Sequence, residues 1–175
     1  MEYVYKSEQT DDRAALIVDI LTRKGWTISF AESCTAGLAA AHLVDIPSAS
    51  NVFNASFVTY SNDAKVKYLG VPEEIIEEKG VVSEEVAVRM AMGTARENGA
   101  QVGVGITGIA GPTGGTAKKP VGMVCFGFYI DGKTMSATKQ FGEIGRDGVR
   151  IASVDYVYDF LTAVLPRLTG MWQEK

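Results

Sequence analysis

The sequence predicts an α/β fold in which helices cover both faces of a mixed β-sheet, a three-layer α/β/α sandwich. Amphipathic segments alternate with short apolar segments along most of the chain, which is the pattern of strands connected by helices. Asp131-Gly132 lies between two further predicted strands and predicts a hairpin, because this dipeptide suits a tight two-residue turn. The sheet should therefore contain both parallel and antiparallel strands.

The N-terminal part of the chain predicts two helices and two strands. Capping residues at positions 10–12 open an amphipathic helix that Gly25 ends. Alternating apolar residues predict a strand over 26–31, and an alanine-rich helix follows over 33–45. The segment 52–60 (VFNASFVTY) is rich in β-branched and aromatic residues and predicts a second strand.

Helices dominate the middle of the chain. Short helices are expected over 62–69 and 73–79, and Ser83 caps a longer one that reaches Asn98. The remaining predicted elements are a strand over 101–107, a glycine-rich loop over 108–116, hairpin strands over 121–130 and 133–141, and a final helix over 147–165 that Pro166 ends.

The composition suits one domain over residues 1–175 and limits its chemistry. The chain has 17 Lys and Arg against 21 Asp and Glu, a net charge of −4, which argues against a nucleic-acid partner. One histidine and two cysteines do not supply a multi-histidine metal site or a disulfide framework, so we expect no metal and no cofactor. Catalysis would then use hydroxyls, carboxylates, amines or backbone groups.

The sequence also favours a cytoplasmic protein. Residues 1–6 lack the apolar run of a secretory signal, and no apolar stretch approaches the roughly 18 residues of a membrane span. We therefore expect reduced thiols and no membrane partner.

Two glycine motifs match nucleotide-binding patterns by letter only. Residues 127–134 (GFYIDGKT) satisfy the phosphate-loop pattern, but they lie in the predicted hairpin rather than before a helix. Residues 103–108 (GVGITG) satisfy the dinucleotide pattern, but a loop follows them where a helix is needed. Neither segment is interpreted as a nucleotide site.

Ser33 stands where the first strand gives way to the predicted helix 33–45. Unpaired N–H groups and the helix dipole would favour an oxyanion or a phosphate there. A serine at such a junction is also a common N-cap, and both interpretations stay open on this position alone.

Lys65 is the best partner for Ser33 if the serine is a nucleophile. His42 lies nine positions later in the same predicted helix and cannot reach the first turn. Lys65 follows the strand that ends at Tyr60, and adjacent parallel strands deliver their C-terminal loops to one edge. A desolvated lysine there can act as a neutral base in a serine–lysine pair.

The glycine-rich loop supplies a candidate anion site. Glycines let successive N–H groups approach a ligand, and Thr107-Gly108-Ile-Ala-Gly111 begins this loop directly after a strand. Arg146, before the last helix, could add a guanidinium fork to a phosphate. An ordinary flexible loop and a surface arginine are the plainer interpretations. With Ser33, these residues indicate an amide or ester substrate that carries a phosphate.

Several separate stretches resemble the CinA C-terminal-domain family, over about residues 10–165. They are Ala31–Gly37 (AESCTAG), Phe57–Asn62 (FVTYSN) with Lys65, Gly80–Ser83 (GVVS), Thr107–Pro112 (TGIAGP) and Lys119–Gly122 (KPVG). Characterised members of this family are nicotinamide mononucleotide (NMN) deamidases with an α/β/α fold, and they commonly self-associate. The length is similar to that of the stand-alone form, so we expect a homo-oligomer of that form.

The resemblance implies hydrolysis of NMN to nicotinate mononucleotide and ammonia, a step of pyridine-nucleotide salvage. It places the catalytic residues at Ser33, Lys65 and Tyr60, with Tyr60 beside the serine–lysine pair as a proton relay for Lys65. The positions expected to bind substrate are Thr35, Ser50, Thr107, Gly108, Gly111 and Arg146.

The chain departs from the family pattern at three places, and alternatives remain. Ala36 stands where a glycine is usual, Pro47–Ser50 reads Pro-Ser-Ala-Ser rather than Pro-Gly-Ser-Ser, and Thr113 replaces a commonly acidic residue or glycine. Ser33 could form an acyl-enzyme or could orient water together with Lys65. The other functions left open are a catalytically silent nucleotide-binding module and a hydrolase of another phosphorylated amide.

Overall fold

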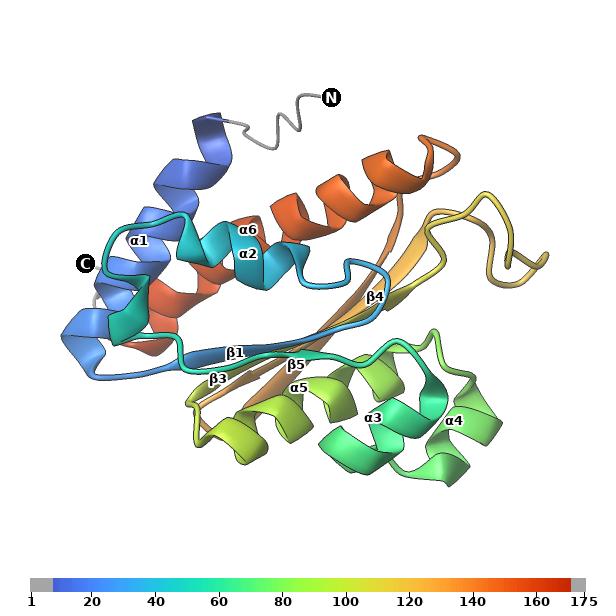
Figure 1. Ribbon diagram of the computed structural model, residues 1–175, viewed down its shortest axis with the longest axis horizontal. Helices are drawn as coiled ribbons and strands as arrows, with labels where there is room; N and C mark the ends of the chain where they lie inside the picture. The colour runs from blue at the N-terminus through green and yellow to red at the C-terminus, as the bar shows by residue number, and fades with distance from the viewer. Residues whose placement is uncertain (1–7, 171–175) are drawn as a thin grey trace.

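The computed structural model describes residues 8–170, with side chains from residue 12 onward, and places helices around a five-stranded sheet (Figure 1). In chain order the elements are α1 (Glu8–Lys24), β1 (Ile28–Glu32), α2 (Leu38–Val44), the 3-10 helix η1 (Ala49–Asn51), β2 (Phe57–Val58), α3 (Asn62–Leu69), α4 (Glu73–Lys79), α5 (Glu84–Asn98), β3 (Val102–Gly108), β4 (Met123–Ile130), β5 (Lys133–Gln140) and α6 (Arg146–Leu168).

The sheet is mixed, as the sequence predicts, with strand order β2-β1-β3-β4-β5. β1 is parallel to both of its neighbours, and Glu32 at its end is in register with Val58 of β2 and Ile106 of β3. β4 is antiparallel to both β3 and β5, and the β4–β5 hairpin turns at Asp131-Gly132. The chain therefore leaves β2, β1 and β3 at the same edge of the sheet.

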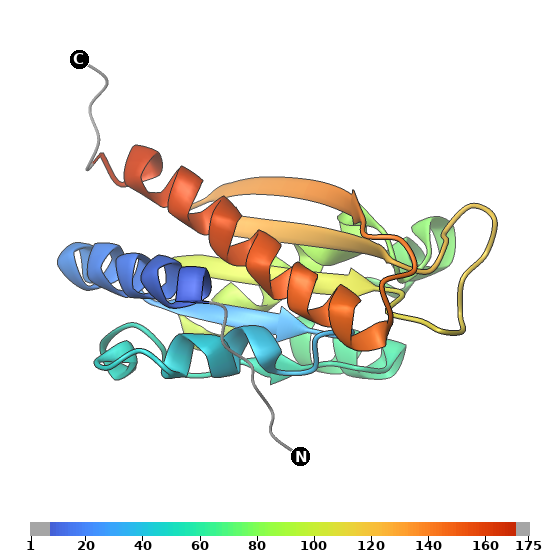
Figure 2. The ribbon, with the colours of Figure 1, turned by 90° about the horizontal axis from the view of Figure 1, so that it is seen from above.

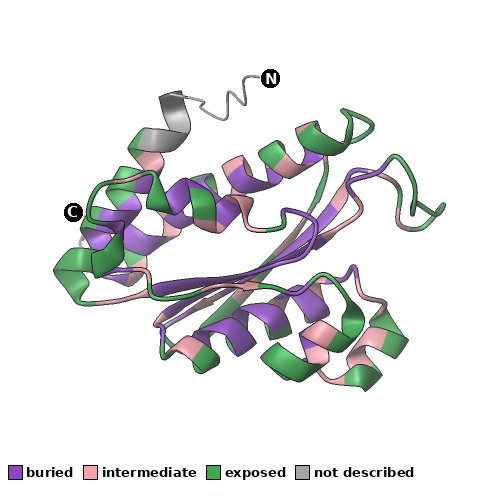
Figure 3. Cartoon of the chain, viewed as in Figure 1, coloured by how far each residue is buried: buried purple, intermediate pink, exposed green. Residues whose placement is uncertain are grey.

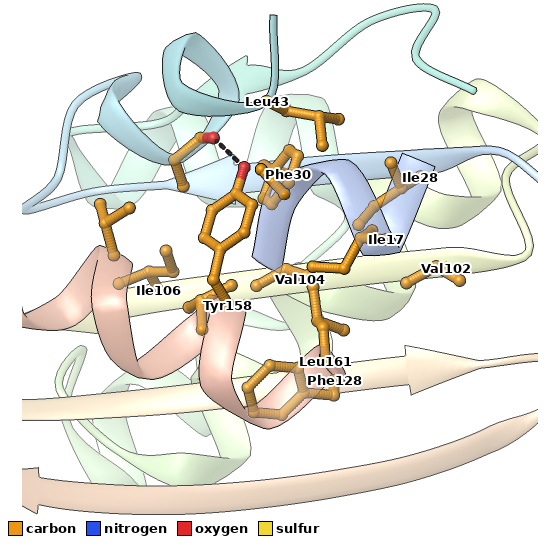
Figure 4. Close-up of a cluster of buried hydrophobic side chains, with 14 of the residues drawn as sticks. Ile17, Ile28, Phe30, Leu43, Val102, Val104, Ile106, Phe128, Tyr158 and Leu161 are labelled. Atoms are coloured by element: carbon orange, nitrogen blue, oxygen red, sulfur yellow. Dashed lines mark hydrogen bonds between the residues drawn. The ribbon is translucent and has the colours of Figure 1, made fainter. Parts of the chain in front are cut away.

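Helices cover both faces, which confirms the three-layer α/β/α fold. α1, α2 and α6 lie on one face, and α3, α4 and α5 lie on the other (Figures 1 and 2). The larger apolar core lies beneath α1 and α6, where Ile17, Phe30 and Leu161 are completely buried (Figure 4). Tyr158 crosses this core and its hydroxyl donates to the carbonyl of Ala39 at 2.8 Å, so a buried polar group is satisfied.

Glycines in the central strands set how closely α5 approaches the sheet. A Cβ atom placed on Gly105 would lie 2.0 Å from the carbonyl oxygen of Ala87, and one on Gly103 would lie 2.1 Å from that of Ala91. Gly127 of β4 meets the backbone of Ala87 in the same way. The buried face of α5 therefore rests directly on backbone (Figure 3). The glycines of the segment 103–108 are thus explained by the packing of α5. The segment 127–134 forms part of the β4–β5 hairpin, so neither segment is a nucleotide-binding loop.

Two predicted elements are wrong in extent at the N-terminal side of the sheet. The helix expected over 33–45 begins only at Leu38, because Ala36 and Gly37 have φ angles of 51° and 94° that no α-helix contains. The strand expected over 52–60 is ordered as β2 only at Phe57–Val58, with one isolated bridge from Phe53 to Ile28.

The outer helices extend further than predicted. α1 begins at Glu8, two residues before the expected cap. α6 continues through Pro166 to Leu168, where Leu165 and Pro166 are buried and Thr169 donates its hydroxyl to the Leu165 carbonyl at 2.6 Å. Within the part of the chain that the structure describes, no helix combines the length and the apolar character needed to cross a membrane.

Replacing Gly105 by alanine should lower the free energy of unfolding by about 3 kcal/mol, because the new methyl group meets helix backbone that cannot rotate away. Gly148→Ala is the matched control. Its Cβ would meet only the half-exposed side chain of Ile144 at 3.2 Å, and alanine favours a helix by up to about 1 kcal/mol. Urea unfolding measures both variants, and wild-type stability of Gly105→Ala would contradict the packing argument.

Candidate active site

A cavity of about 320 Å³ opens at the edge where β2, β1 and β3 end. This is the edge at which ligands bind in open α/β sheets. The cavity is lined by Ser33, Cys34, Tyr60, Asn62, Lys65, Val81, Val82, Thr107, Gly108, Ile109, Ala110, Gly111, Thr113, Gly114 and Arg146. Seven of these are predicted site residues, namely Ser33, Lys65, Tyr60, Thr107, Gly108, Gly111 and Arg146.

Lys65 reaches the floor of this cavity from α3. Ser61 caps that helix by accepting from the Ala64 N–H at 3.1 Å, which fixes the first turn just before the lysine. The Lys65 side chain is completely buried, whereas Lys67 on the same helix is exposed. Burial lowers the pKa of the Lys65 amine to about 8, because the charged form loses its hydration.

Three oxygen atoms surround the Lys65 amine. Nζ lies 2.8 Å from the carbonyl oxygen of Thr59, 3.3 Å from that of Tyr60 and 3.1 Å from Ser33 Oγ. A neutral amine has two N–H bonds and one lone pair. When the two carbonyls take the N–H bonds, the lone pair faces Ser33 Oγ, which is the geometry a general base needs.

Ser33 lies in a turn before α2 rather than at the start of that helix. The side chain of Glu32, which is completely buried, accepts from the N–H groups of Gly37, Ala39 and Ala40 at 3.0, 3.1 and 2.9 Å. A carboxylate of the protein thus occupies the helix N-terminus. The N–H groups at the start of α2 are therefore occupied, and any oxyanion donor near Ser33 lies in the turn that the sequence predicts as the beginning of this helix.

The turn offers other donors close to Ser33. Among the described residues, the backbone N–H groups of Cys34 and Thr35 donate to no other residue. Cys34 lines the cavity and directly follows the serine, so its N–H is the better placed oxyanion donor. Burial raises the pKa of the Cys34 thiol to about 12, which leaves it protonated and unreactive.

The glycine-rich loop forms the other wall of the cavity and projects beyond the sheet edge (Figures 1 and 2). Thr107 Oγ1 donates to the Val81 carbonyl at 2.9 Å, which anchors the start of the loop. Four cavity-lining residues have N–H groups without an acceptor among the described residues: Ala110, Gly111, Thr113 and Gly114. Such a series of free N–H groups can bind an anion.

Arg146 closes the cavity at the first residue of α6. Its guanidinium donates to the Gly111 carbonyl at 2.9 Å and to the Tyr60 hydroxyl at 3.0 Å. It therefore joins the glycine loop to the segment after β2. Tyr60 contributes its carbonyl to Lys65, whereas its hydroxyl contacts Arg146 rather than the amine.

Two predicted substrate-binding residues do not line the cavity. Thr35 is completely buried and its Oγ1 has no partner among the described residues. Ser50 is exposed in η1 at the opposite edge of the sheet, where the Val52 carbonyl accepts from Ile28 at the start of β1. Within the described chain, neither side chain is in the cavity.

The sequence reasoning missed three residues of the site. Asn62 lines the cavity one helical turn before Lys65, and this spacing was the available signal. Glu32 holds the turn after β1, and Arg150 of α6 contacts the same turn. Glu32 acts on backbone only five to eight residues ahead in the chain, whereas Arg150 contacts the turn from more than 100 residues away, which no local pattern reveals.

The fold and this site define an α/β/α domain with a buried serine–lysine pair at the carboxyl edge of a mixed sheet. In the described range, no group of three or more His, Cys, Asp or Glu side chains is arranged to hold a metal ion. The model of the CinA C-terminal domain matches residues 10–165, and the chain belongs to this family.

Relatives and solved structures agree with this assignment. A CinA-like protein of Kosmotoga olearia is 45% identical over 166 residues, which cover 94% of this chain and 40% of that protein. The chain therefore spans less than half of such curated relatives. A competence/damage inducible protein, CihA, of Agrobacterium tumefaciens has a TM-score of 0.87 at 38% identity and covers 93% of this chain and 98% of its own. Competence damage-inducible protein A of Klebsiella pneumoniae has a TM-score of 0.86 at 30% identity. The match covers 94% of this chain and 99% of that protein's chain.

The lowered pKa of Lys65 predicts a pH-dependent stability. Between about 8 and the ordinary 10.5, the unfolded chain holds a proton that the folded chain releases, so the folded state gains stability as the pH rises. Relative to Lys65→Met, the wild type should gain up to about 3 kcal/mol across this window. Urea unfolding of both proteins near pH 7 and pH 10 measures the change, and a constant difference would contradict it.

Proposed function

We propose that this domain is an amidohydrolase that converts nicotinamide mononucleotide and water to nicotinate mononucleotide and ammonia, in the cytoplasm and without a cofactor. The observation that carries the proposal is the contact of 3.1 Å between the buried Lys65 amine and Ser33 Oγ at the floor of a cavity. A buried amine with a lowered pKa beside a hydroxyl is the arrangement of an activated nucleophile.

The first half of the reaction forms an acyl-enzyme. Neutral Lys65 removes the Ser33 proton as Oγ attacks the carboxamide carbon, and the Cys34 N–H stabilises the resulting oxyanion. The lysine ammonium then gives its proton to the amide nitrogen, which leaves as ammonia when the C–N bond breaks. Because the pKa is about 8, roughly a tenth of the amine is already neutral at pH 7.

The second half restores the enzyme. Water attacks the acyl carbon while Lys65 takes one of its protons, and the ester bond to Ser33 breaks. The serine recovers that proton from the ammonium, and the carboxylic acid, which keeps the other water proton, leaves and ionises in solvent. Lys65 thus serves as base and acid in each half, and its two carbonyl partners hold the amine at one position throughout.

The rest of the cavity suits the phosphate end of the substrate. The free N–H groups of the glycine loop and the Arg146 guanidinium provide donors for phosphate oxygens. Asn62, on the same wall as Lys65, adds an amide that can contact ribose hydroxyls. The loop and Tyr60 are joined by Arg146, so an anion bound there contacts both walls.

A catalytically silent binding module fits the site less well. Burial of the Lys65 amine lowers the stability of the fold, and a module that only binds a phosphate would need the loop and Arg146 alone. A silent module therefore gives no reason for the buried lysine. Hydrolysis of another phosphorylated amide would use the same residues. A comparison of ammonia release from NMN and from other phosphorylated amides distinguishes this alternative from the leading proposal.

Ser33→Ala and Lys65→Ala should each lower ammonia release from NMN by about 10⁴-fold or more, because one removes the nucleophile and the other removes its base. Lys67→Ala is the matched control, since Lys67 lies on the same helix but is exposed beside the Tyr68 ring. Circular dichroism checks that each variant is folded. Near-normal turnover in either site variant would refute the serine–lysine pair, and binding of NMN to the wild type without product would favour a silent module.

The phosphate contacts should determine substrate choice. Nicotinamide riboside, which lacks the phosphate, should have a kcat/KM at least about 100-fold below that of NMN, because charge-assisted hydrogen bonds are lost. Arg146→Met should lower kcat/KM for NMN and leave that for the riboside nearly unchanged. The ammonia assay measures all four combinations. Equal rates on NMN and free nicotinamide would contradict a phosphate-binding role of the loop and Arg146.

A further inference from the structure

Arg150 contacts the nucleophile turn from α6. Its Nε donates to the Cys34 carbonyl at 3.1 Å, and its Nη2 donates to the Thr35 carbonyl at 3.2 Å. Nη1 lies 3.6 Å from the exposed carboxylate of Asp147. The guanidinium therefore bridges two successive carbonyls directly after Ser33, and only a quarter of its side chain is exposed.

The Cys34 carbonyl depends on this contact. Among the described residues it accepts from Arg150 alone, whereas the Thr35 carbonyl also accepts from the Leu38 N–H. On the far side of the turn, Glu32 holds the N–H groups of residues that follow Gly37. Cys34 thus lies between two contacts that fix the turn, one from Glu32 and one from Arg150. The contact from α6 is the hydrogen bond of Arg150 to the Cys34 carbonyl.

The turn needs such an anchor because its backbone is unusual. Ala36 has a φ of 51°, a region that costs a residue with a Cβ atom about 1–2 kcal/mol. Without the guanidinium, the Cys34 carbonyl would be left without its partner, and rotation of the peptide unit between Cys34 and Thr35 would relieve it. The Cys34 N–H belongs to the preceding peptide unit, which meets this one at the Cys34 Cα, so a turn whose Cys34 carbonyl is no longer held does not keep that N–H fixed beside Ser33.

We propose that Arg150 is a positioning residue for the reaction proposed above: it holds the Cys34 backbone so that its N–H meets the oxyanion that forms on attack by Ser33. The inference rests on the proposed function. Arg150 does not line the cavity, so it acts through the turn rather than on the substrate. Its loss should therefore slow the chemical step and leave substrate binding nearly intact.

Arg150→Ala should lower kcat for NMN by about 100-fold, the effect of losing or misplacing one oxyanion donor, with KM changed less than about threefold. Added guanidinium at millimolar concentration should restore at least a tenth of the lost rate. Arg150→Gln, which keeps one side-chain donor, should retain an intermediate kcat. The apparent pKa of the rate should stay near that of the wild type, because the contacts of Lys65 are unchanged.

Arg13→Ala is the matched control, since Arg13 also ties α6 to another element and is similarly buried, but contacts Asp155 and Asp159. It should lower the melting temperature and leave kcat at 25 °C unchanged. Wild-type kcat in Arg150→Ala, or an equal loss in Arg13→Ala, would overturn the positioning role. If Arg150→Ala does not fold, Arg150→Gln is the test: an intermediate kcat supports the positioning role, and a wild-type kcat overturns it. An inactive wild type would refute the proposed function instead, so the two failures are distinguishable.

Discussion

Burial of the Lys65 amine is the constraint on which the site depends. An amine without water needs fixed oxygen partners, and these are carbonyls of the segment that follows β2. The depth of the lysine is set by packing, because α3 rests on α5 at Gly93, where a Cβ would lie 2.2 Å from the Leu69 carbonyl. α5 in turn rests on the glycines of β3 and β4. Glycines far from the cavity therefore determine whether Nζ reaches Ser33.

The buried side chain of Glu32 separates the nucleophile turn from the anion site, two tasks that the N-terminus of one helix often combines. The Glu32 carboxylate fills the N-terminus of α2 and satisfies three of its N–H groups. No substrate anion can then bind there, and the series of free N–H groups that suits a phosphate lies in the glycine loop instead. The nucleophile turn is thus held rigid by the protein itself, while the loop remains available to a ligand.

Local patterns predicted the layers, the hairpin and the residues that meet at the sheet edge. Ser33 and Lys65 were predictable because parallel strands with adjacent C-terminal ends bring their loops together. The start of α2 was not, because the positive φ angles of Ala36 and Gly37 depend on contacts from Glu32 and Arg150. Ser50 follows the family motif, yet where η1 folds relative to the sheet is a tertiary property that the motif does not contain.

α6 connects the two parts of the proposed mechanism. Arg146 and Arg150 are four residues apart and project from one face, toward the loop and toward the nucleophile turn. A cation in the first turns of a helix is disfavoured by the helix dipole, by about 0.3–1 kcal/mol. Carbonyl partners offset this cost, and an anionic substrate beside Arg146 would offset it further. A chain of net charge −4 can therefore attract a phosphate locally, because the cations are concentrated where the helix begins.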